Sequence, residues 1–343
     1  MNKNISAVIT VYNKQNTIGK TLESLLAQPV DFKEIIVVDD GSIDNSAKII
    51  NEFSDNHKNI KYIFQKNQGV AQALNTGLKM VSTDFVAVFD GDITLDDNWI
   101  SKLMPYFSAQ GGSPPEADAP LEYASGGQDE KVAAVSGLTK LMNNKNIWSA
   151  LAGYNVEYRQ SKISQEFVDH LSTTNTIYRK SVLDKLGLFD PDFRYGQDNE
   201  LSYRIISAGY KLALSHKTFC LHFWPESFMG YVKQRLHGAL ARMMLIKKHP
   251  KRWSGDKVSS LRYFFELPLG LIFLLSLVIS LIYPCFLTIA VIVFFIIYVF
   301  QFDEIKFFLK NKKTFIGIFL PFFIALRSIA WLSGIIKFYF VKK

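Results

Sequence analysis

Short apolar runs alternate with helical patterns through the first part of the chain. The runs at 5–11, 34–38, 60–64 and 85–89 are almost entirely apolar and often β-branched, which predicts four buried strands. Between them, apolar side chains recur every three or four positions and predict helices at 18–26, 45–53, 70–81 and from about 99. This alternation predicts an α/β fold, with a mostly parallel sheet covered by helices on both faces.

The pattern is interrupted once and then resumes. Residues 108–131 are rich in Gly, Pro, Ala and Ser and hold five acids and one base, so we expect a flexible surface insertion. A functional lid is the alternative for this segment. Further strands are predicted at 132–137, 171–178, 211–214 and 218–223, with a helix at 198–208.

The C-terminal third of the chain has a different character. Residues 228–263 are basic and amphipathic, and the run 267–302 contains no charge. A spanning helix needs about 20 apolar residues, so this run predicts a transmembrane hairpin that turns near Tyr283-Pro284. The apolar segment 314–336 carries Arg327 at its centre and either spans the membrane or breaks into shorter pieces.

Charge is divided unevenly between these parts. Residues 1–230 hold 22 Lys and Arg against 27 Asp and Glu, whereas 231–343 hold 17 against 4. Basic flanks beside apolar runs favour contact with membrane lipids over nucleic acid, and the positive-inside rule places them on the cytoplasmic side. The N-terminus lacks a signal-peptide pattern. We therefore expect a multi-pass protein of the cell membrane, with a cytosolic domain at 1–227, an interfacial segment at 228–263 and a membrane region at 264–343.

Asp90-Gly91-Asp92 directly follows the fourth predicted strand. Two carboxylates this close repel each other unless a cation neutralises them, and Mg²⁺ or Mn²⁺ binds carboxylate together with phosphate oxygens. Glycine allows the backbone to approach a ligand closely. A plain turn that caps the next helix is the alternative. In parallel sheets, ligands bind beyond the carboxyl ends of the strands, where Tyr12-Asn13 and Asp39-Asp40 also lie.

The order of these motifs resembles the family 2 inverting glycosyltransferases, which have the GT-A fold. The resemblance extends over roughly residues 4–225 and is carried by ITVYNKQNTIGKTLESLLAQ, EIIVVDDGSIDNS, NQGVAQALNTGLKMVSTDFVAVFDGD and GLFDPDFRYGQDNELSYRIISAGYKL. It implies a nucleotide-sugar donor whose nucleotide and diphosphate are bound by Thr10, Tyr12, Asn13, Asp40, Lys66, Asn67, Asp90, Gly91 and Asp92. It also implies a divalent metal, Mg²⁺ or Mn²⁺, held by Asp92 foremost, with Asp90 and His222 as further candidate ligands.

The resemblance places the catalytic base at Asp198, near the start of a helix. Gln197 stands where family members often have Glu, which leaves the tuning of the base open. A plain helix acid stabilised by the helix dipole is the alternative for Asp198. Glu200 is expected to support the helix. Thr174-Asn175 is a candidate lining of the acceptor pocket, and His222 is as readily structural as a ligand.

The function implied is transfer of a single sugar, with inversion, to an acceptor hydroxyl or phosphate. The membrane segments favour a lipid-linked acceptor, such as a polyprenyl-phosphate or a lipid-linked glycan. Residues 234–238 lack the Gln-x-x-Arg-Trp signature of processive synthases. A sugar-phosphate nucleotidyltransferase would need a glycine-rich loop, which 10–17 lacks. The remaining alternative is a catalytically weak membrane scaffold that binds a nucleotide sugar.

Overall fold

The computed structural model describes residues 4–108, 131–250 and 262–340, and the chain divides into two compact units. The first unit comprises 1–142 and 163–223, and the second comprises 143–162 and 224–343. The sequence places 143–162 in the N-terminal domain, whereas the structure groups this segment with the C-terminal helices. Most of the predicted insertion, residues 109–130, lies outside the described residues.

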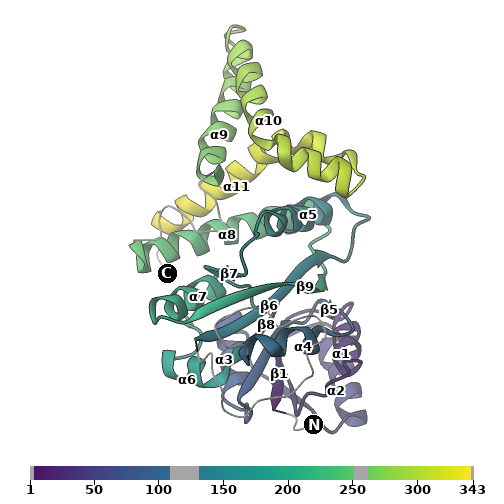
Figure 1. The fold of residues 1–343 in the computed structure, drawn as a ribbon. Coiled ribbons are helices and arrows are strands. Elements are labelled where there is room, and N and C mark those ends of the chain that lie inside the picture. The colour runs from purple at the N-terminus through teal and green to yellow at the C-terminus, as the bar shows by residue number, and fades with distance from the viewer. Residues whose placement is uncertain (1–3, 109–130, 251–261, 341–343) are drawn as a thin grey trace. The chain divides into compact units, whose positions relative to one another are not determined.

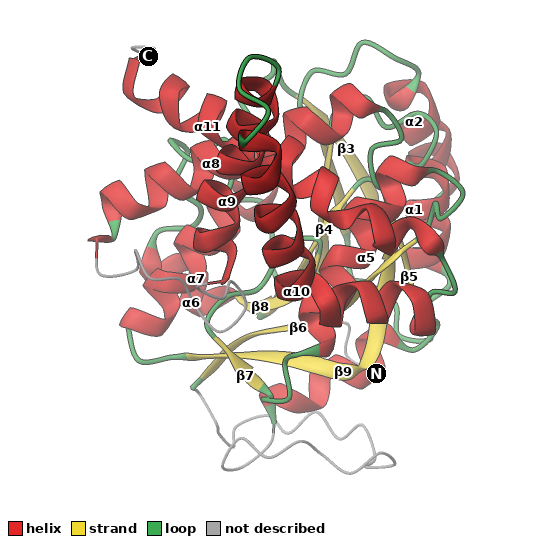
Figure 2. Ribbon diagram, turned by 90° about the horizontal axis from the view of Figure 1, so that it is seen from above, coloured by secondary structure: helices red, strands yellow, loops and turns green. Residues whose placement is uncertain are grey.

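The first unit is built on one mixed sheet (Figures 1 and 2). Its strands follow the order β3-β2-β1-β4-β8-β6-β9-β5, and a short strand β7 pairs with β9. β3, β2, β1 and β4 run parallel to one another, whereas β8 is antiparallel to β4. The strands are β1 (Ile5–Val11), β2 (Ile35–Asp39), β3 (Ile60–Phe64), β4 (Phe85–Asp90), β5 (Ile93–Leu95), β6 (Val132–Leu141), β7 (Phe167–Val168), β8 (Asn175–Arg179) and β9 (Lys211–His222).

The helices of this unit are α1 (Ile18–Leu26), α2 (Ser46–Asn56), α3 (Val70–Leu78), α4 (Trp99–Leu103), α6 (Lys180–Leu186) and α7 (Gln197–Ser207). The first three connect the parallel strands β1 to β4. α3 packs on β1 and β2. A Cβ at Gly77 of α3 would lie 2.5 Å from Val8 and 3.2 Å from Val38, so the close approach of this helix to the sheet requires glycine. The predicted α/β fold with a mostly parallel sheet is confirmed.

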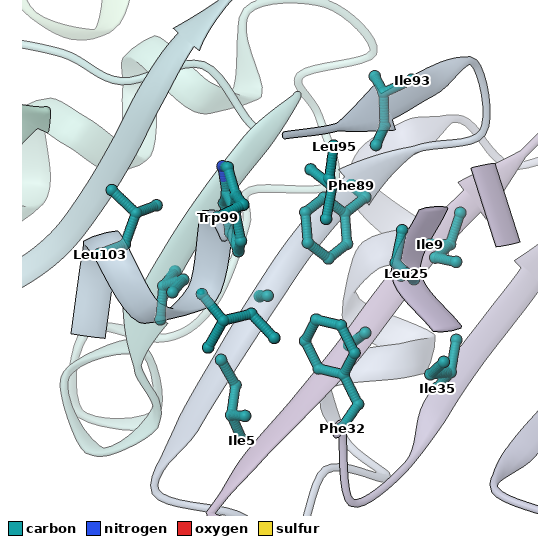
Figure 3. Close-up of a cluster of buried hydrophobic side chains, with 14 of the residues drawn as sticks. Ile5, Ile9, Leu25, Phe32, Ile35, Phe89, Ile93, Leu95, Trp99 and Leu103 are labelled. Carbon is teal, nitrogen blue, oxygen red and sulfur yellow. The ribbon is translucent and has the colours of Figure 1, made fainter. Parts of the chain in front are cut away.

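The hydrophobic core includes buried side chains of α1 and α4 together with those of β1, β2 and β4 (Figure 3). Phe89 on β4 contacts Trp99 of α4, with ring centroids 5.1 Å apart, and meets Phe32 edge-on at 6.1 Å. All three rings are almost completely buried. Burial of such a side chain contributes about 1.5–3 kcal/mol, so the core fixes the strand that ends in the Asp90 motif.

Strand register brings the predicted polar motifs to one edge. Val11 pairs with Asp39 across β1 and β2, and Thr10 pairs with Asp90 across β1 and β4. Because the three strands are parallel, their carboxyl ends lie side by side. The residues that follow these strands therefore meet at one edge of the sheet.

The second unit is helical. It contains α5 (Ile147–Ser161), α8 (Phe228–Lys248), α9 (Arg262–Ser280), α10 (Phe286–Asn311), a 3₁₀ helix (Phe315–Phe319) and α11 (Leu320–Phe340). α9 and α10 pack against each other and are joined by a turn at 281–285, near the predicted turn, but the apolar part of α9 (Phe265–Ser280) is shorter than a candidate span. Among the described residues, Phe286–Asn311 and Phe315–Phe340 are long and apolar enough to cross a membrane.

The second unit buries several polar side chains and exposes many apolar ones. Glu266, Gln301 and Glu304 are at most 3% exposed, whereas Leu281 and Val299 are more than 70% exposed. The amide of Gln301 donates to Glu266 (2.6 Å), and Arg327 forms an ion pair with the same carboxylate. A buried network of this kind provides hydrogen-bond partners for polar groups, which hydrocarbon cannot provide.

Candidate active site

The Asp90-Gly91-Asp92 segment leaves β4 and turns toward β5. The Gly91 amide donates to the carbonyl of Thr10 (3.1 Å), and its carbonyl accepts from the Thr17 hydroxyl (3.0 Å). A Cβ at Gly91 would lie 3.0 Å from Val11 and 3.2 Å from the Thr10 carbonyl oxygen. Glycine at this position therefore permits the turn that holds the two aspartates on the same side of the strand end.

His222 reaches the aspartates through strand pairing. β5 is antiparallel to β9, which places Ile93 opposite His222, and the Phe223 amide donates to the Asp92 carbonyl (2.9 Å). The Nε2 atom of His222 lies 3.3 Å from Asp92 Oδ1 and 3.9 Å from Asp90 Oδ2. The sequence leaves a ligand role and a structural role open for His222, and the structure places its imidazole within the acidic cluster.

A fourth charged side chain completes this cluster. The ammonium group of Lys14, in the loop between β1 and α1, donates to Asp92 Oδ2. Asp92 thus lies between a lysine and a histidine, and its side chain is only 6% exposed. Lys14 lies within the N-terminal motif, but the sequence gives no reason to assign it to the aspartates, because the contact joins residues 78 positions apart.

The pKa values of these groups reflect burial and mutual attraction. Burial alone would raise the pKa of Asp92, but His222 and Lys14 hold it below the ordinary value. Burial and the charge of Asp92 together raise the pKa of Asp90. Burial would lower the pKa of His222, yet the two carboxylates raise it above its ordinary value. His222 and Lys14 therefore favour the ionised form of Asp92, whereas burial and Asp92 disfavour the ionised form of Asp90.

The donor set fits a divalent metal. Asp90, Asp92 and His222 each offer one ligand atom, and these three atoms lie within 4.8 Å of one another. Carboxylate and imidazole are ligands that Mn²⁺ accepts, and Mg²⁺ takes carboxylates together with substrate phosphates. The Asp92 carboxylate is nearly buried and has protein cations beside it. A bound metal ion could neutralise its charge in their place.

Asp40, at the end of β2, organises the loop that follows β3. Its Oδ1 atom accepts from the Gln65 side chain (2.7 Å) and the Gln68 amide (2.9 Å), and its Oδ2 atom accepts from the Gly69 amide (2.8 Å). This loop contains Lys66 and Asn67, which are both exposed. Asp40 therefore shapes the loop that carries Lys66 and Asn67, which are also predicted to bind the nucleotide.

Tyr12 and Asn13, two further predicted nucleotide-binding residues, lie in the loop after β1, whereas Thr10 lies within β1 itself. Tyr12 is 48% exposed, an arrangement suited to stacking on a planar base. Asn13 adopts φ +53° and ties two loops together, because its amide donates to Ser42 Oγ and its side-chain oxygen accepts from the Ile43 amide, both at 2.9 Å. The Asn13 side chain therefore contributes to the shape of the loop, and its Oδ1 atom already accepts a protein hydrogen bond.

Asp198 lies in the first turn of α7. Gly196 precedes the helix with φ +73°, which favours glycine, and the Asp198 carboxylate accepts from the Asn199 amide (2.8 Å). Burial raises the pKa of Asp198, while the charge of His170 opposes that rise. The hydrogen bonds that the structure records for Asp198 are at the start of its own helix and do not join it to the Asp90–Asp92 cluster.

The neighbours of Asp198 have structural roles. Glu200 is completely buried and pairs with Arg204, whose guanidinium also donates to the carbonyls of Leu186 and Leu188 at 2.6 Å. This agrees with the supporting role predicted for Glu200. Gln197 is 7% exposed and donates to Thr173 Oγ1 at 3.4 Å, so its amide occupies a buried polar position.

Asn175, predicted to line an acceptor pocket together with Thr174, instead joins strands in the core. Its side-chain oxygen accepts from Trp99 Nε1 (3.1 Å) and the Gly137 amide (2.9 Å), and its Nδ2 atom donates to Thr139 Oγ1 (3.3 Å) and Cys220 Sγ (3.0 Å). Asn175 is 1% exposed and is unavailable to an acceptor. Thr174, by contrast, hydrogen-bonds the Asp90 side chain, and its place in an acceptor pocket stays a prediction.

Asn175→Leu is expected to destabilise the protein by about 2–4 kcal/mol, because it leaves the Trp99 and Gly137 donors buried without acceptors. The free energy of unfolding can be measured by urea denaturation of the detergent-solubilised chain. Asn56→Leu, at an exposed position on α2, is the matched control and is expected to change stability by no more than about 0.5 kcal/mol. Equal stability of the two variants would contradict the strand-joining role.

Two family models match the chain in succession. The glycosyl transferase family 2 model matches residues 6–113, and the glycosyl transferase family group 2 model matches 116–302. The chain therefore belongs to the family 2 glycosyltransferases. Membership confirms the family, the GT-A fold and the enzyme class predicted from the sequence, a nucleotide-sugar-dependent glycosyltransferase.

Among curated relatives, the chain is similar to the poly-β-1,6-N-acetyl-D-glucosamine synthases of Staphylococcus aureus and Staphylococcus epidermidis. Identity is 28% over 242 residues for the first and 29% over 243 for the second. Each match covers 68% of this chain, and the chain spans about half the length of these relatives (53%).

Among solved structures, the fold is similar to that of a mannosyltransferase from Pyrobaculum calidifontis in complex with GDP-Man and Mn²⁺. The TM-score is 0.58 at 15% sequence identity, and the match covers 99% of this chain and 88% of the other. At this identity, the likeness establishes a shared fold.

Proposed function

We propose that the protein is a membrane-anchored, inverting glycosyltransferase that moves one sugar from a nucleotide-diphosphate sugar to a lipid-linked acceptor. The observation that carries the proposal is the cluster of Asp90, Asp92 and His222 at the carboxyl ends of parallel strands. This edge is where α/β sheets bind phosphorylated ligands. The solved mannosyltransferase of similar fold holds both a nucleotide sugar and Mn²⁺, which supports a metal-dependent donor site.

Each part of the cluster has a role in this proposal. Asp92, with Asp90 and His222, would hold a divalent cation, which when bound offsets the negative charge that develops on the departing diphosphate. Tyr12 stacks on the nucleobase, and the loop shaped by Asp40 brings Lys66 and Asn67 to the nucleotide. Asp198 accepts the proton of the acceptor hydroxyl. The hydroxyl oxygen attacks the anomeric carbon from the face opposite the nucleotide. The bond to the diphosphate breaks as the new glycosidic bond forms, and the configuration inverts.

The C-terminal helices support a lipid-linked acceptor. Phe286–Asn311 and Phe315–Phe340 expose many apolar side chains, while Gln301, Glu304 and Ser328 are buried, which is expected where such segments are surrounded by lipid. A chain held in the membrane meets membrane-embedded acceptors at high local concentration. We further propose that the catalytic unit faces the cytoplasm, because the basic flanks of the apolar segments favour that side.

Polymer synthesis is the second candidate, favoured by similarity to poly-β-1,6-N-acetyl-D-glucosamine synthases. We prefer single transfer because residues 234–238 lack the processive signature. Sizing of the product separates the two activities. One added residue per acceptor supports single transfer, whereas a ladder of lengthening products would establish polymerisation.

EDTA is expected to abolish sugar transfer, because the diphosphate then departs without the cation that offsets its charge. The experiment incubates the full chain with radiolabelled UDP-, GDP- and dTDP-sugars and a membrane lipid extract. Mn²⁺ or Mg²⁺ added in excess over EDTA should restore label in the lipid fraction. Transfer that persists undiminished in EDTA would exclude metal-dependent catalysis.

A further inference from the structure

The backbone of Lys14 is fixed at the entrance to α1. Its amide donates to Ser46 Oγ (2.8 Å), and its carbonyl accepts from the amides of Thr17 (3.0 Å) and Ile18 (2.9 Å). The backbone of Lys14 is therefore held beside the aspartate cluster in any conformation of its side chain. Beyond the Cβ atom, however, lysine has a flexible four-carbon stem that can place its ammonium group at several points.

The ammonium group lies on the carboxylate oxygen that a cation would need. It contacts Asp92 Oδ2, while His222 lies on the Oδ1 side of the same carboxylate. Asp92 is almost buried, but the side chain of Lys14 is 35% exposed. Of the two partners in this ion pair, Lys14 is the one with room to move.

A divalent cation and an ammonium group cannot share this oxygen closely. At the separation that a shared oxygen imposes, a doubly charged cation and an ammonium group repel each other strongly. A metal bound here would therefore displace the ammonium group from Asp92. The nearest new anion is the diphosphate of the donor, which a metal at the cluster of Asp90, Asp92 and His222 would hold.

We propose that Lys14 is an exchangeable counter-ion, which neutralises Asp92 before the metal binds and then passes to the donor diphosphate. Lys14 in this way couples the two binding events, because the cost of moving it off Asp92 is recovered only when the diphosphate arrives. The inference rests on the metal-and-diphosphate site of the proposed function. It adds a positioning role for a residue that contacts the aspartates through its side chain.

The coupling has two opposite consequences for Lys14→Met, which keeps the length of the stem and removes the charge. Without nucleotide, Mn²⁺ no longer competes with an ammonium group, so its affinity should rise about tenfold. With Mn²⁺ present, the affinity for nucleoside diphosphate should fall about tenfold, because the diphosphate loses a cationic partner. A merely structural residue would not move the two affinities in opposite directions.

The test is an electron paramagnetic resonance titration of free Mn²⁺ against the full chain, with and without saturating UDP or GDP. Lys14→Met is compared with wild type and with Lys20→Met, an exposed lysine on α1 that should leave both affinities unchanged. Lys14→Arg, which retains the charge, should lie nearer to wild type. Circular dichroism of each variant verifies that the fold is retained.

The outcomes separate this inference from the proposed function. Tighter Mn²⁺ binding together with weaker nucleotide binding in Lys14→Met supports the exchange. If wild type binds both ligands normally and Lys14→Met leaves both affinities unchanged, or weakens both, the exchange alone is overturned. Failure of wild type to bind Mn²⁺ with or without nucleotide overturns the metal site and the exchange with it.

Discussion

Asp92→Asn is expected to lower kcat/KM for sugar transfer by about a thousandfold, a loss of roughly 4 kcal/mol of transition-state stabilisation. His222, 3.3 Å from Asp92, and Lys14 on the other carboxylate oxygen hold the pKa of Asp92 below its ordinary value in spite of burial. The amide keeps the shape of the side chain but carries no charge for a metal. The departing diphosphate then lacks its main electrostatic partner.

The measurement is initial-rate kinetics with the preferred donor and saturating Mn²⁺. Asp97→Asn is the matched control, because Asp97 lies five positions further along the chain and is exposed. It is expected to retain wild-type kcat/KM within about twofold, since exposed substitutions away from a site have small effects. A rate for Asp92→Asn within tenfold of wild type would refute the assignment of Asp92 as the principal ligand.

Asp198→Asn is expected to lower kcat by roughly 10²- to 10⁴-fold, the contribution of a positioned general base. Unlike Asp92→Asn, it should leave the affinity for Mn²⁺ and nucleoside diphosphate unchanged. The two variants therefore separate donor binding from proton transfer. Asp192→Asn, an exposed aspartate in the loop before α7, serves as the control. Weakened nucleotide binding by Asp198→Asn, with kcat preserved, would assign Asp198 to the donor site instead.

The pH dependence of transfer gives a second view of the same residue. Burial raises the pKa of Asp198 above the ordinary aspartate value of about 3.9, so the base is protonated and inactive at a pH where a surface aspartate is ionised. The acidic limb of kcat/KM is therefore expected above pH 4, with activity rising as pH increases through the pKa. This limb should disappear in Asp198→Asn.

The strands β1, β2 and β4 could be predicted from the sequence because they are almost fully buried and are therefore continuous apolar runs. The edge strand β3 is only partly buried and includes Lys61, but its remaining residues are apolar or aromatic. β9 is different: the sequence predicts two strands, whereas the structure has one long strand with a register shift opposite Gly137 and Leu138. The polar residues Ser215, His216 and Lys217 lie at that irregularity, so local polarity does not end the strand.

Helix α5 and its place in the second unit could not be predicted. Its buried residues lie around most of its circumference, so no amphipathic stripe marks it as a helix. Its partners are distant in sequence: Asn155 donates to Glu304 (2.7 Å), and Tyr154 packs edge-on against Phe308. Contacts over some 150 residues leave no local pattern.

In the candidate site, too, residues that are contiguous in sequence could be predicted, and residues brought together by distant contacts could not. The motif Asp90-Gly91-Asp92 could be found because it is contiguous and follows a strand. His222 could be proposed only as an even alternative, because its position depends on the pairing of β5 with β9. Nothing in the sequence indicates that Lys14 contacts an aspartate. Asn175 is predicted to line a pocket because it lies in a polar stretch, whereas its four hydrogen bonds hold it in the core.

The most direct test of the central claim is the number of Mn²⁺ ions bound per chain in the presence of nucleoside diphosphate. Equilibrium dialysis of the full chain with UDP or GDP measures this number for wild type and for the double variant Asp90→Asn/Asp92→Asn. Wild type is expected to bind one ion tightly and the double variant none, with the free energy of unfolding of both proteins measured alongside. Equal binding of Mn²⁺ by the two proteins would contradict a metal site at Asp90 and Asp92.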